Sequence, residues 1–261
     1  MSKWTLFSCI ILSLSMASCR KKPLPVPDNN KPIPTKGTIN IKINNQVGSK
    51  PLVLGDLAPY TLANGEVFRI STYDYYLSNI AFIDEQGNRF LEQESYHLIS
   101  AKTPESLSFV IKNVPFATYK SIEFTIGVDS LRNFSGAQTG ALDPKYGMFW
   151  TWNSGYIMAR LEGNSPQSTA ANNNIAYHIG GYKFPYNVLQ KVKLDLVSSA
   201  MVADTVSPVI HVHSNAAAWF TDLGFNPFSF SKTPNVTTEG ENAVLISNNY
   251  SKMFTVDAVT H

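Results

Sequence analysis

The sequence predicts an all-β fold, a single-domain β-sandwich of mostly antiparallel strands. Several segments alternate apolar and polar residues with a period of two, and short polar turns separate the apolar runs. Convincing helical periodicity is missing, apart from a turn or two over residues 216–220. Many short strands joined by turns are typical of a sandwich.

Residues 1–18 have the three parts of a signal peptide. Lys3 gives a positively charged start, an apolar run covers residues 6–16, and small residues precede Cys19. The run is too short to cross a bilayer, which needs about 20 apolar residues, but it suits a signal peptide. The Met-Ala-Ser-Cys end resembles a lipobox, so we expect cleavage before Cys19 and lipid on that cysteine. Ordinary secretion, with a cysteine beside the cleavage site by chance, is the alternative.

Residues 19–36 predict a tether that follows the lipidated cysteine. Three basic residues come directly after Cys19, and five prolines are spread over positions 23–34. Proline at this density favours an extended, semi-rigid spacer, because it fits neither helix nor sheet interiors. The basic residues add weak attraction to anionic headgroups. Arg20 in place of an acidic residue favours an anchor in the outer membrane, facing the periplasm or the cell surface.

Residues 37–261 predict the folded domain. Alternation in segments 39–43, 122–128 and 192–196 places one face of each strand in the core. Residues 84–88 join two apolar runs and predict a hairpin connection. Residues 164–174, rich in Ser, Ala and Asn, predict an exposed loop. No fixed-period repeat and no second domain is evident.

Charge and cysteine content exclude several classes of function. The 21 basic and 19 acidic residues nearly cancel, which argues against a nucleic-acid partner. Cys9 lies in the signal peptide and Cys19 in the lipobox, so the folded domain contains no cysteine. Internal disulfides, thiolate zinc sites and cysteine nucleophiles are therefore excluded. A metal site must use His, Met, Asp, Glu or backbone oxygen.

The most unusual segment, residues 140–156, contains Met148, Trp150 and Trp152. Side chains two apart in a strand share a face, so the two indoles and the thioether would form one soft, oxidisable wall. From the spacing alone, a sandwich core in which tryptophan is common remains the alternative.

This segment resembles the signature of the MbnP family, the periplasmic copper-binding proteins named for methanobactin operons. Other motifs of the family occur in its order, and the resemblance covers about residues 37–200. These motifs are Tyr75-Tyr76-Leu77-Ser78-Asn79, Gly127-Val128-Asp129 with Asn133 and Gly136, Leu161-Glu162-Gly163, and His178-Ile179-Gly180-Gly181.

The resemblance implies an envelope lipoprotein, not itself an enzyme, that binds Cu(I) and serves copper homeostasis. A partner diheme enzyme of the cytochrome c peroxidase and MauG type would oxidise Trp150 to kynurenine, with Trp152 as its companion in the motif. His178 is the expected copper ligand and His97 the second candidate. Imidazole nitrogen suits copper and thioether sulfur selects the reduced ion, so Met148 would support the site.

The sequence departs from the family in its first strand. Family members often carry a histidine there, but this chain has Asn40, Asn44, Asn45 and Gln46. The later cysteines of many members are also absent. Different, weaker or absent copper binding are therefore alternatives to the family's site.

Other candidate ligands have simpler explanations. His211 and His213 share a strand face and could chelate, but Ile210 and Val212 form the better core face, so we expect the histidines to face solvent. The terminal His261 is a weaker candidate. Asp129, Asn133 and Asp143 offer oxygen ligands for calcium, but turn capping explains them more simply.

Two other function classes compete with copper binding. A non-catalytic surface lipoprotein that binds a glycan or another ligand would place its tryptophans on an open face. A hydrolase is disfavoured, because the sequence has no Gly-x-Ser-x-Gly elbow, no cysteine nucleophile and no His-Glu-x-x-His helix.

Overall fold

The computed structural model describes residues 35–55, 59–152, 155–221 and 228–261. The predicted signal peptide, the lipidation site Cys19 and nearly all of the tether lie outside the described residues. The strands are β1 (Lys36–Val47), β2 (Lys50–Pro51), β3 (Tyr60–Thr61), β4 (Val67–Asp84), β5 (Arg89–Leu91), β6 (Tyr96–Ser100), β7 (Ser108–Pro115), β8 (Ala117–Ile126), β9 (Phe149–Trp150), β10 (Gly155–Asn164), β11 (Asn174–Gly180), β12 (Gln190–Val202), β13 (Val209–Asn215), β14 (Asn235–Val236) and β15 (Phe254–Thr260). The helices are α1 (Ser130–Phe134) and α2 (Glu241–Tyr250), with 3-10 turns η1 (Pro104–Leu107), η2 (Gly140–Leu142), η3 (Pro144–Tyr146), η4 (Ala171–Asn173) and η5 (Ala216–Phe220).

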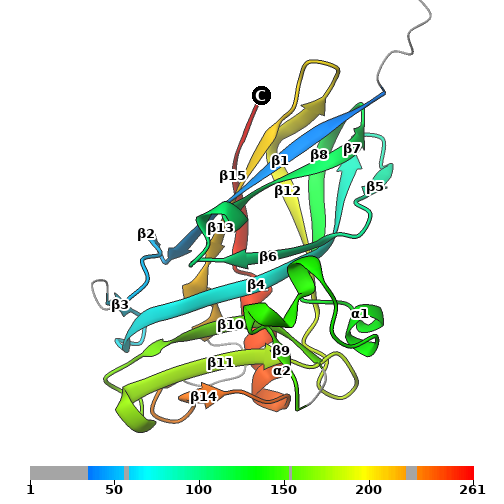
Figure 1. Ribbon diagram of the computed structural model, residues 1–261. Coiled ribbons are helices and arrows are strands. Elements are labelled where there is room, and N and C mark those ends of the chain that lie inside the picture. The colour runs from blue at the N-terminus through cyan, green and yellow to red at the C-terminus, as the bar shows by residue number, and fades with distance from the viewer. Residues whose placement is uncertain (1–34, 56–58, 153–154, 222–227) are drawn as a thin grey trace, which may run out of the picture. The chain divides into compact units, whose positions relative to one another are not determined.

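Within these residues the strands form two sheets, which confirms the predicted all-β sandwich. The smaller sheet has the order β15-β13-β1-β2, with β7 also paired to β1. The larger sheet has the order β12-β8-β4-β10-β11-β14, and β3, β5, β6 and β9 pair with its members. Pairing is mostly antiparallel, but β1 with β13 and β11 with β14 run parallel. In Figure 1, β4, β10, β11 and β14 follow one another through the lower half of the view.

The two sheets meet face to face through aromatic side chains. Phe254 of β15 lies between Tyr75 of β4 and Phe124 of β8, with ring centroids 5.6 and 5.0 Å away. Tyr73 of β4 also reaches the smaller sheet, because its hydroxyl lies 2.9 Å from Ser214 Oγ. Odd-numbered residues in this part of β4 therefore face the inter-sheet core, and even-numbered ones such as Asp74 face the opposite, outer side of the larger sheet.

The alternating segments are strands, as predicted. Ile39, Ile41 and Ile43 are buried in β1, and so are the alternating apolar residues of β8. Segment 192–196 lies in β12, where Val192 is buried and the next two alternate residues are half-buried. The predicted hairpin connection is also present, because β4 ends at Asp84 and β5 follows four residues of turn.

Two expectations about irregular segments are only partly correct. The helical turn at residues 216–220 is η5. The helix α2, which buries Ile246, Ser247 and Tyr250, was not predicted. The loop between β10 and β11 was predicted to be exposed, yet Ser165 and Ser168 are buried. Their hydroxyls bond to the Val67 and Asn174 carbonyls, which removes the cost of burying them.

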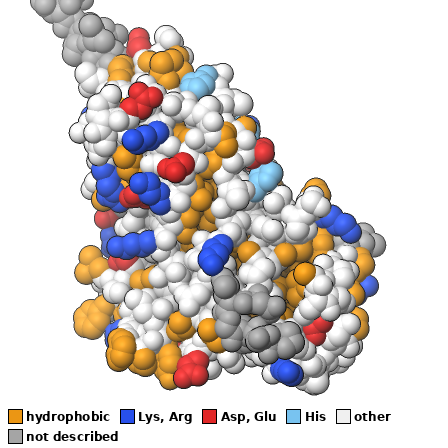
Figure 2. Space-filling view, turned by 180° about the vertical axis from the view of Figure 1, so that it is seen from behind, with side chains coloured by type: hydrophobic (Ala, Val, Ile, Leu, Met, Phe, Trp, Pro, Cys, Tyr) orange, Lys and Arg blue, Asp and Glu red, His pale blue; other side chains and the backbone are white. Residues whose placement is uncertain are grey.

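The surface is mixed in charge on the face that Figure 2 presents. Acidic and basic side chains are interspersed along the upper part of this face, and hydrophobic side chains gather at its lower edge (Figure 2). In the part of the chain that the structure covers, no helix is both long and apolar enough to cross a membrane.

Candidate functional site

The tryptophan pair lies at a short hairpin on the edge of the larger sheet. β9 pairs with the start of β10, with Trp150 opposite Gly155 and Phe149 opposite Tyr156. The strand ends at Trp150, so the prediction that Trp152 shares its strand face is wrong: Trp152 lies in the turn that follows. The two indoles still meet, with ring centroids 5.3 Å apart and planes inclined by 38°. Trp150 is only 6% exposed, whereas Trp152 is 63% exposed.

A glycine at the end of β11 makes room for the Trp150 ring. A Cβ atom built on Gly180 would lie 2.5 Å from Cη2 and Cζ3 of Trp150, far inside van der Waals contact. The next glycine of the motif, Gly181, has a φ of 122°, and a Cβ there would lie 2.2 Å from the Tyr186 carbonyl oxygen. Gly180 is therefore required by its packing against the indole, and Gly181 by its positive φ and its approach to the Tyr186 backbone.

His178 lies on the same side of β11 as the Trp150 ring. Residues two apart in a strand share a face and are separated by about 6.6 Å, so the imidazole sits one side-chain row from Gly180 and the indole above it. Its Nε2 atom lies 2.7 Å from Oε1 of Glu162 on β10. The hydrogen bond from His178, together with one from Thr72, outweighs partial burial and lowers the pKa of Glu162 to about 2.

A partly buried ion pair continues this polar row across the sheet. Asp74, Arg160 and His178 are register partners on β4, β10 and β11, so all three side chains face the outer side. Arg160 donates to Oδ2 of Asp74 from Nη2 at 2.5 Å and from Nε at 3.1 Å. Its third nitrogen, Nη1, donates to the Gly147 carbonyl at 3.1 Å. Arg160 therefore ties the segment leading into the tryptophan motif to the centre of the sheet.

Asp74 also borders a small outer-face pocket. The pocket has a volume of about 350 Å³, and Lys102, Tyr146 and Arg160 are among its lining residues. Asp74 is 3% exposed, and its Oδ1 atom has no hydrogen-bond partner among the described residues.

The sequence did not identify Asp74 or Arg160 as residues of the site, and it identified Glu162 only as part of a motif. The available signal was the pair of charges two apart in the otherwise apolar β10.

His97 does not share a face of the sheet with His178, and Met148 lies in the hydrophobic core. Met148 is fully buried in the hydrophobic core. In the pairing of β6 with β4, His97 lies opposite Leu77, and Ser100 lies opposite Asp74. His97 and Ser100 are three residues apart, so their side chains point to opposite faces of the sheet. Asp74 and His178 share the outer face, so His97 faces the other side. Its ring stacks on Phe109 of the smaller sheet at 4.1 Å, and its Nε2 lies 2.9 Å from Oε2 of Glu92. One ion cannot contact both histidines in this arrangement.

The remaining histidines lie on other elements. Ile210 and Val212 are buried in β13, as predicted, while His211 and His213 are partly exposed on the other face. His213 Nε2 lies 3.7 Å from Oδ2 of Asp257. The ring of His261 accepts a hydrogen bond from the Met201 amide at 3.1 Å.

The candidate calcium ligands cap turns. Asp129 is the N-cap of α1 and accepts from the Arg132 amide at 3.2 Å, and Asp143 caps η3 by accepting from the Lys145 amide at 3.0 Å. Asn133 is buried, and its Oδ1 accepts from the Tyr156 amide at 2.8 Å. These polar groups are engaged in holding the segments on either side of the tryptophan hairpin.

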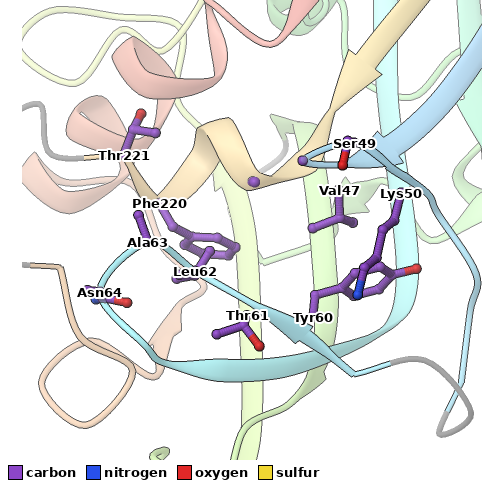
Figure 3. Close-up of a pocket in the computed structure, with 12 residues that line it drawn as sticks. Val47, Ser49, Lys50, Tyr60, Thr61, Leu62, Ala63, Asn64, Phe220 and Thr221 are labelled. Carbon is purple, nitrogen blue, oxygen red and sulfur yellow. The ribbon is translucent and has the colours of Figure 1, made fainter.

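A second hollow lies away from these elements. It has a volume of about 440 Å³ between the β1–β2 turn, β3 and η5 (Figure 3). Leu62 and Phe220 point into it, and the Tyr60 hydroxyl accepts from the Val53 amide at 2.7 Å. The described residues that line it include no histidine and no carboxylate.

Fold and site together define a β-sandwich protein that holds a tryptophan pair over a histidine-bearing strand. The chain belongs to the MbnP family, whose model matches residues 36–254. A comparison with curated proteins finds no significant match. The solved structure of MbnP from Methylosinus trichosporium is similar, with a TM-score of 0.51 and 13% identity, over 80% of this chain and 87% of that one. At this identity the likeness shows a shared fold alone.

Across the described ranges, no group of three or more His, Cys, Asp or Glu side chains is arranged to hold a metal ion. The site has one imidazole, the carboxylates of Glu162 and Asp74, and one buried indole within a few side-chain rows. Such a set has one strong nitrogen ligand and one oxidisable ring, which is less than a complete metal centre requires.

Proposed function

We propose that this protein is a lipid-anchored, copper-binding member of the MbnP family, and that a partner diheme enzyme oxidises its Trp150 to kynurenine. The observation that carries the proposal is the placement of the Trp150 indole over Gly180, on the face of β11 that also bears His178. A residue to be modified and a copper-binding imidazole thus belong to one site. Family membership supports the copper-related role.

The residues present fit copper in part. Imidazole nitrogen is a good copper ligand, and a carboxylate that bonds the other ring nitrogen commonly orients such a histidine. Glu162 holds Nε2 of His178, which leaves Nδ1 as the nitrogen that would bind the ion. Opening the indole of Trp150 would add an amine and a carbonyl to the donor set. Met148 comes directly before β9 and is buried in the same hydrophobic core as Trp150, and its thioether would favour the reduced ion.

In this proposal the protein is the substrate of the partner, not an enzyme. The diheme enzyme, of the cytochrome c peroxidase and MauG type, supplies the oxidising equivalents. Lipid on Cys19 would hold the chain at the membrane, with the outer membrane favoured, where envelope redox enzymes reach it. Copper storage or handling in the envelope is the resulting role.

The proposal is tested on protein taken from native membranes. Metal analysis should find copper, and peptide mass spectrometry should find kynurenine at position 150. His178→Gln should lose the copper. The controls His97→Gln and His211→Gln each remove an imidazole that lies on another face of the molecule, so they should keep it. Copper-free protein with an intact Trp150 in the native membrane would refute the proposal.

The alternative is a surface lipoprotein that binds a glycan or another ligand without copper. The observation in its favour is the exposure of Trp152, together with that of Phe134 and Phe184 on neighbouring segments. Against it, Trp150 is buried, so the pair does not form an open aromatic platform. A glycan array probed with the wild type and Trp152→Ala distinguishes the two, because only the alternative predicts binding that Trp152→Ala abolishes.

A further inference from the structure

The two buried tryptophans of the described domain differ in their neighbours. Trp150 contacts the exposed Trp152, and the 5.3 Å between ring centroids falls within the range of direct aromatic contact. Trp219 is 0% exposed, and its ring contacts Tyr73 and Tyr250, which are themselves fully buried. Trp150 is therefore in contact with a second indole that is exposed to solvent, whereas the ring contacts of Trp219 among the described residues are with fully buried tyrosines.

Burial restricts how Trp150 can be oxidised. Gly180 lies against its six-membered ring, and Trp152 lies against it from the turn. A bulky oxidant cannot touch an indole that is 6% exposed, but it can touch one that is 63% exposed. Indole gives up an electron more readily than other neutral aromatic side chains, and electrons pass quickly between rings in contact.

We propose that Trp152 is the surface relay through which a one-electron oxidant removes an electron from Trp150. The oxidant, a high-valent metal complex or haem, takes one electron from Trp152 and is reduced by one electron, which leaves a cation radical on that indole. One electron then passes from Trp150 to Trp152, which restores neutral Trp152 and leaves the radical on Trp150. The Trp150 radical cation releases its indole N–H proton to water. The relay rests on the proposed function only in taking Trp150 as the residue to be modified.

The proposal is tested without the native partner. The full-length protein in detergent is illuminated in air with tris(bipyridine)ruthenium and a sacrificial electron acceptor, which generates the ruthenium(III) oxidant. Dioxygen captures the tryptophan radicals. Because Trp150 and Trp152 lie on one peptide, tandem mass spectrometry assigns each added oxygen to Trp150, Trp152 or Trp219, and only the oxidation assigned to Trp150 is compared with that of Trp219. In the wild type we expect Trp150 to be oxidised well ahead of Trp219, although both are buried.

Trp152→Phe keeps an aromatic ring in the turn but removes the oxidisable indole. In this variant, oxidation of Trp150 should fall to the level of Trp219 in the same sample. Tyr146→Phe is the matched control, because Tyr146 is an oxidisable ring that is 45% exposed and lies four residues before Trp150. It should leave the oxidation of Trp150 unchanged. Near-ultraviolet circular dichroism checks that both variants keep the native packing.

Two results would overturn the relay: equal oxidation of Trp150 in the wild type and in Trp152→Phe, or no preference for Trp150 over Trp219 in the wild type. Either can occur while native protein contains copper and kynurenine, so the relay can fail alone. Conversely, native protein without copper or kynurenine removes the proposed function but leaves the photo-oxidation result standing.

Discussion

At the scale of single residues, the packing of Trp150 on Gly180 gives the sharpest stability prediction. Gly180→Ala places a methyl group 2.5 Å from the indole and 3.0 Å from the Tyr156 carbonyl oxygen, so the ring must move. Overpacking of this kind costs about 1–3 kcal/mol of unfolding free energy. Urea unfolding should record that loss, and tryptophan fluorescence should shift to the red as Trp150 meets water.

A double-mutant cycle separates the two contacts. In the Trp150→Ala background the added methyl group has room, so Gly180→Ala should cost clearly less there than in the wild type. An equal cost in both backgrounds would show that the Tyr156 backbone, and not the indole, makes the glycine necessary.

The Glu162–His178 pair predicts a specific dependence of stability on pH. The pKa of Glu162 is lowered from its usual 4.5 to about 2 in the folded protein, chiefly by the hydrogen bond from His178. A carboxyl group whose pKa is lower in the folded state stabilises the fold above its unfolded pKa. That contribution is lost as the pH falls from about 4.5 through about 2.

Glu162→Gln should remove this part of the acid sensitivity. Unfolding free energies measured across that pH window should fall less steeply in the variant than in the wild type. Glu105→Gln, at an exposed glutamate of η1, serves as the control and should follow the wild-type curve. A Glu162→Gln curve parallel to the wild type would contradict the assignment.

The sequence located the residues of this site better than their contacts. Trp150, His178 and Gly180 all stood in recognisable motifs, but it is the pairing of β9 with β10, and of β10 with β11, that brings the indole to the face of His178 and Gly180. Glu162 also stood in a motif, but its hydrogen bond to His178 was not predicted. Pairing between distant segments is set by the packing of the whole sheet, which a local pattern does not encode.

At the scale of elements, α1 holds the strand that follows the tryptophan hairpin. Asn133 accepts a hydrogen bond from the Tyr156 amide at 2.8 Å and donates to the carbonyls of Val128 and Asp129. Asn133→Ala leaves the buried Tyr156 N–H without its partner, which costs about 1–3 kcal/mol. Urea unfolding should show this loss, and hydrogen exchange at the Tyr156 amide should accelerate.

Asn133→Asp provides a matched comparison. The aspartate keeps an oxygen for the Tyr156 amide but loses the two donated hydrogen bonds, so exchange at that amide should stay slow even if global stability falls. Equally fast exchange in both variants would mean that the whole helix, and not this one acceptor, protects the strand.

Elements with clean alternation were predictable and the rest were not. β1 and β8 bury one apolar face each, so a period of two reveals them. α2 escaped because it buries the polar Ser247 and Asn249 among its apolar residues, and Asn249 is accommodated by hydrogen bonds to the Trp219 and Thr221 carbonyls. Such burial depends on partners far along the chain, so helical periodicity does not appear in the local sequence.

At the scale of the whole molecule, the sandwich decides which histidines can cooperate. Strand alternation gives each sheet an inner and an outer face, and a shift of one residue moves a side chain from one to the other. His97 and His178 fall on opposite faces of the larger sheet because of their register with β4 and β10. The sequence shows that both residues are histidines, but it does not show how the strands that carry them are aligned with β4 and β10. That His97 and His178 lie on opposite faces was therefore not predictable.

The last prediction concerns the attachment of the molecule to the membrane. The elements of the described fold begin at Lys36, so we expect the core to form without lipid on Cys19. Cys19→Ala should abolish incorporation of labelled palmitate and move the protein from the membrane to the soluble envelope fraction, with the thermal unfolding midpoint unchanged. Cys9→Ala is the control, because Cys9 lies in the apolar part of the predicted signal peptide and would be removed with it. That variant should remain lipidated and membrane-bound. Palmitate labelling that persists in Cys19→Ala would show that the anchor lies elsewhere.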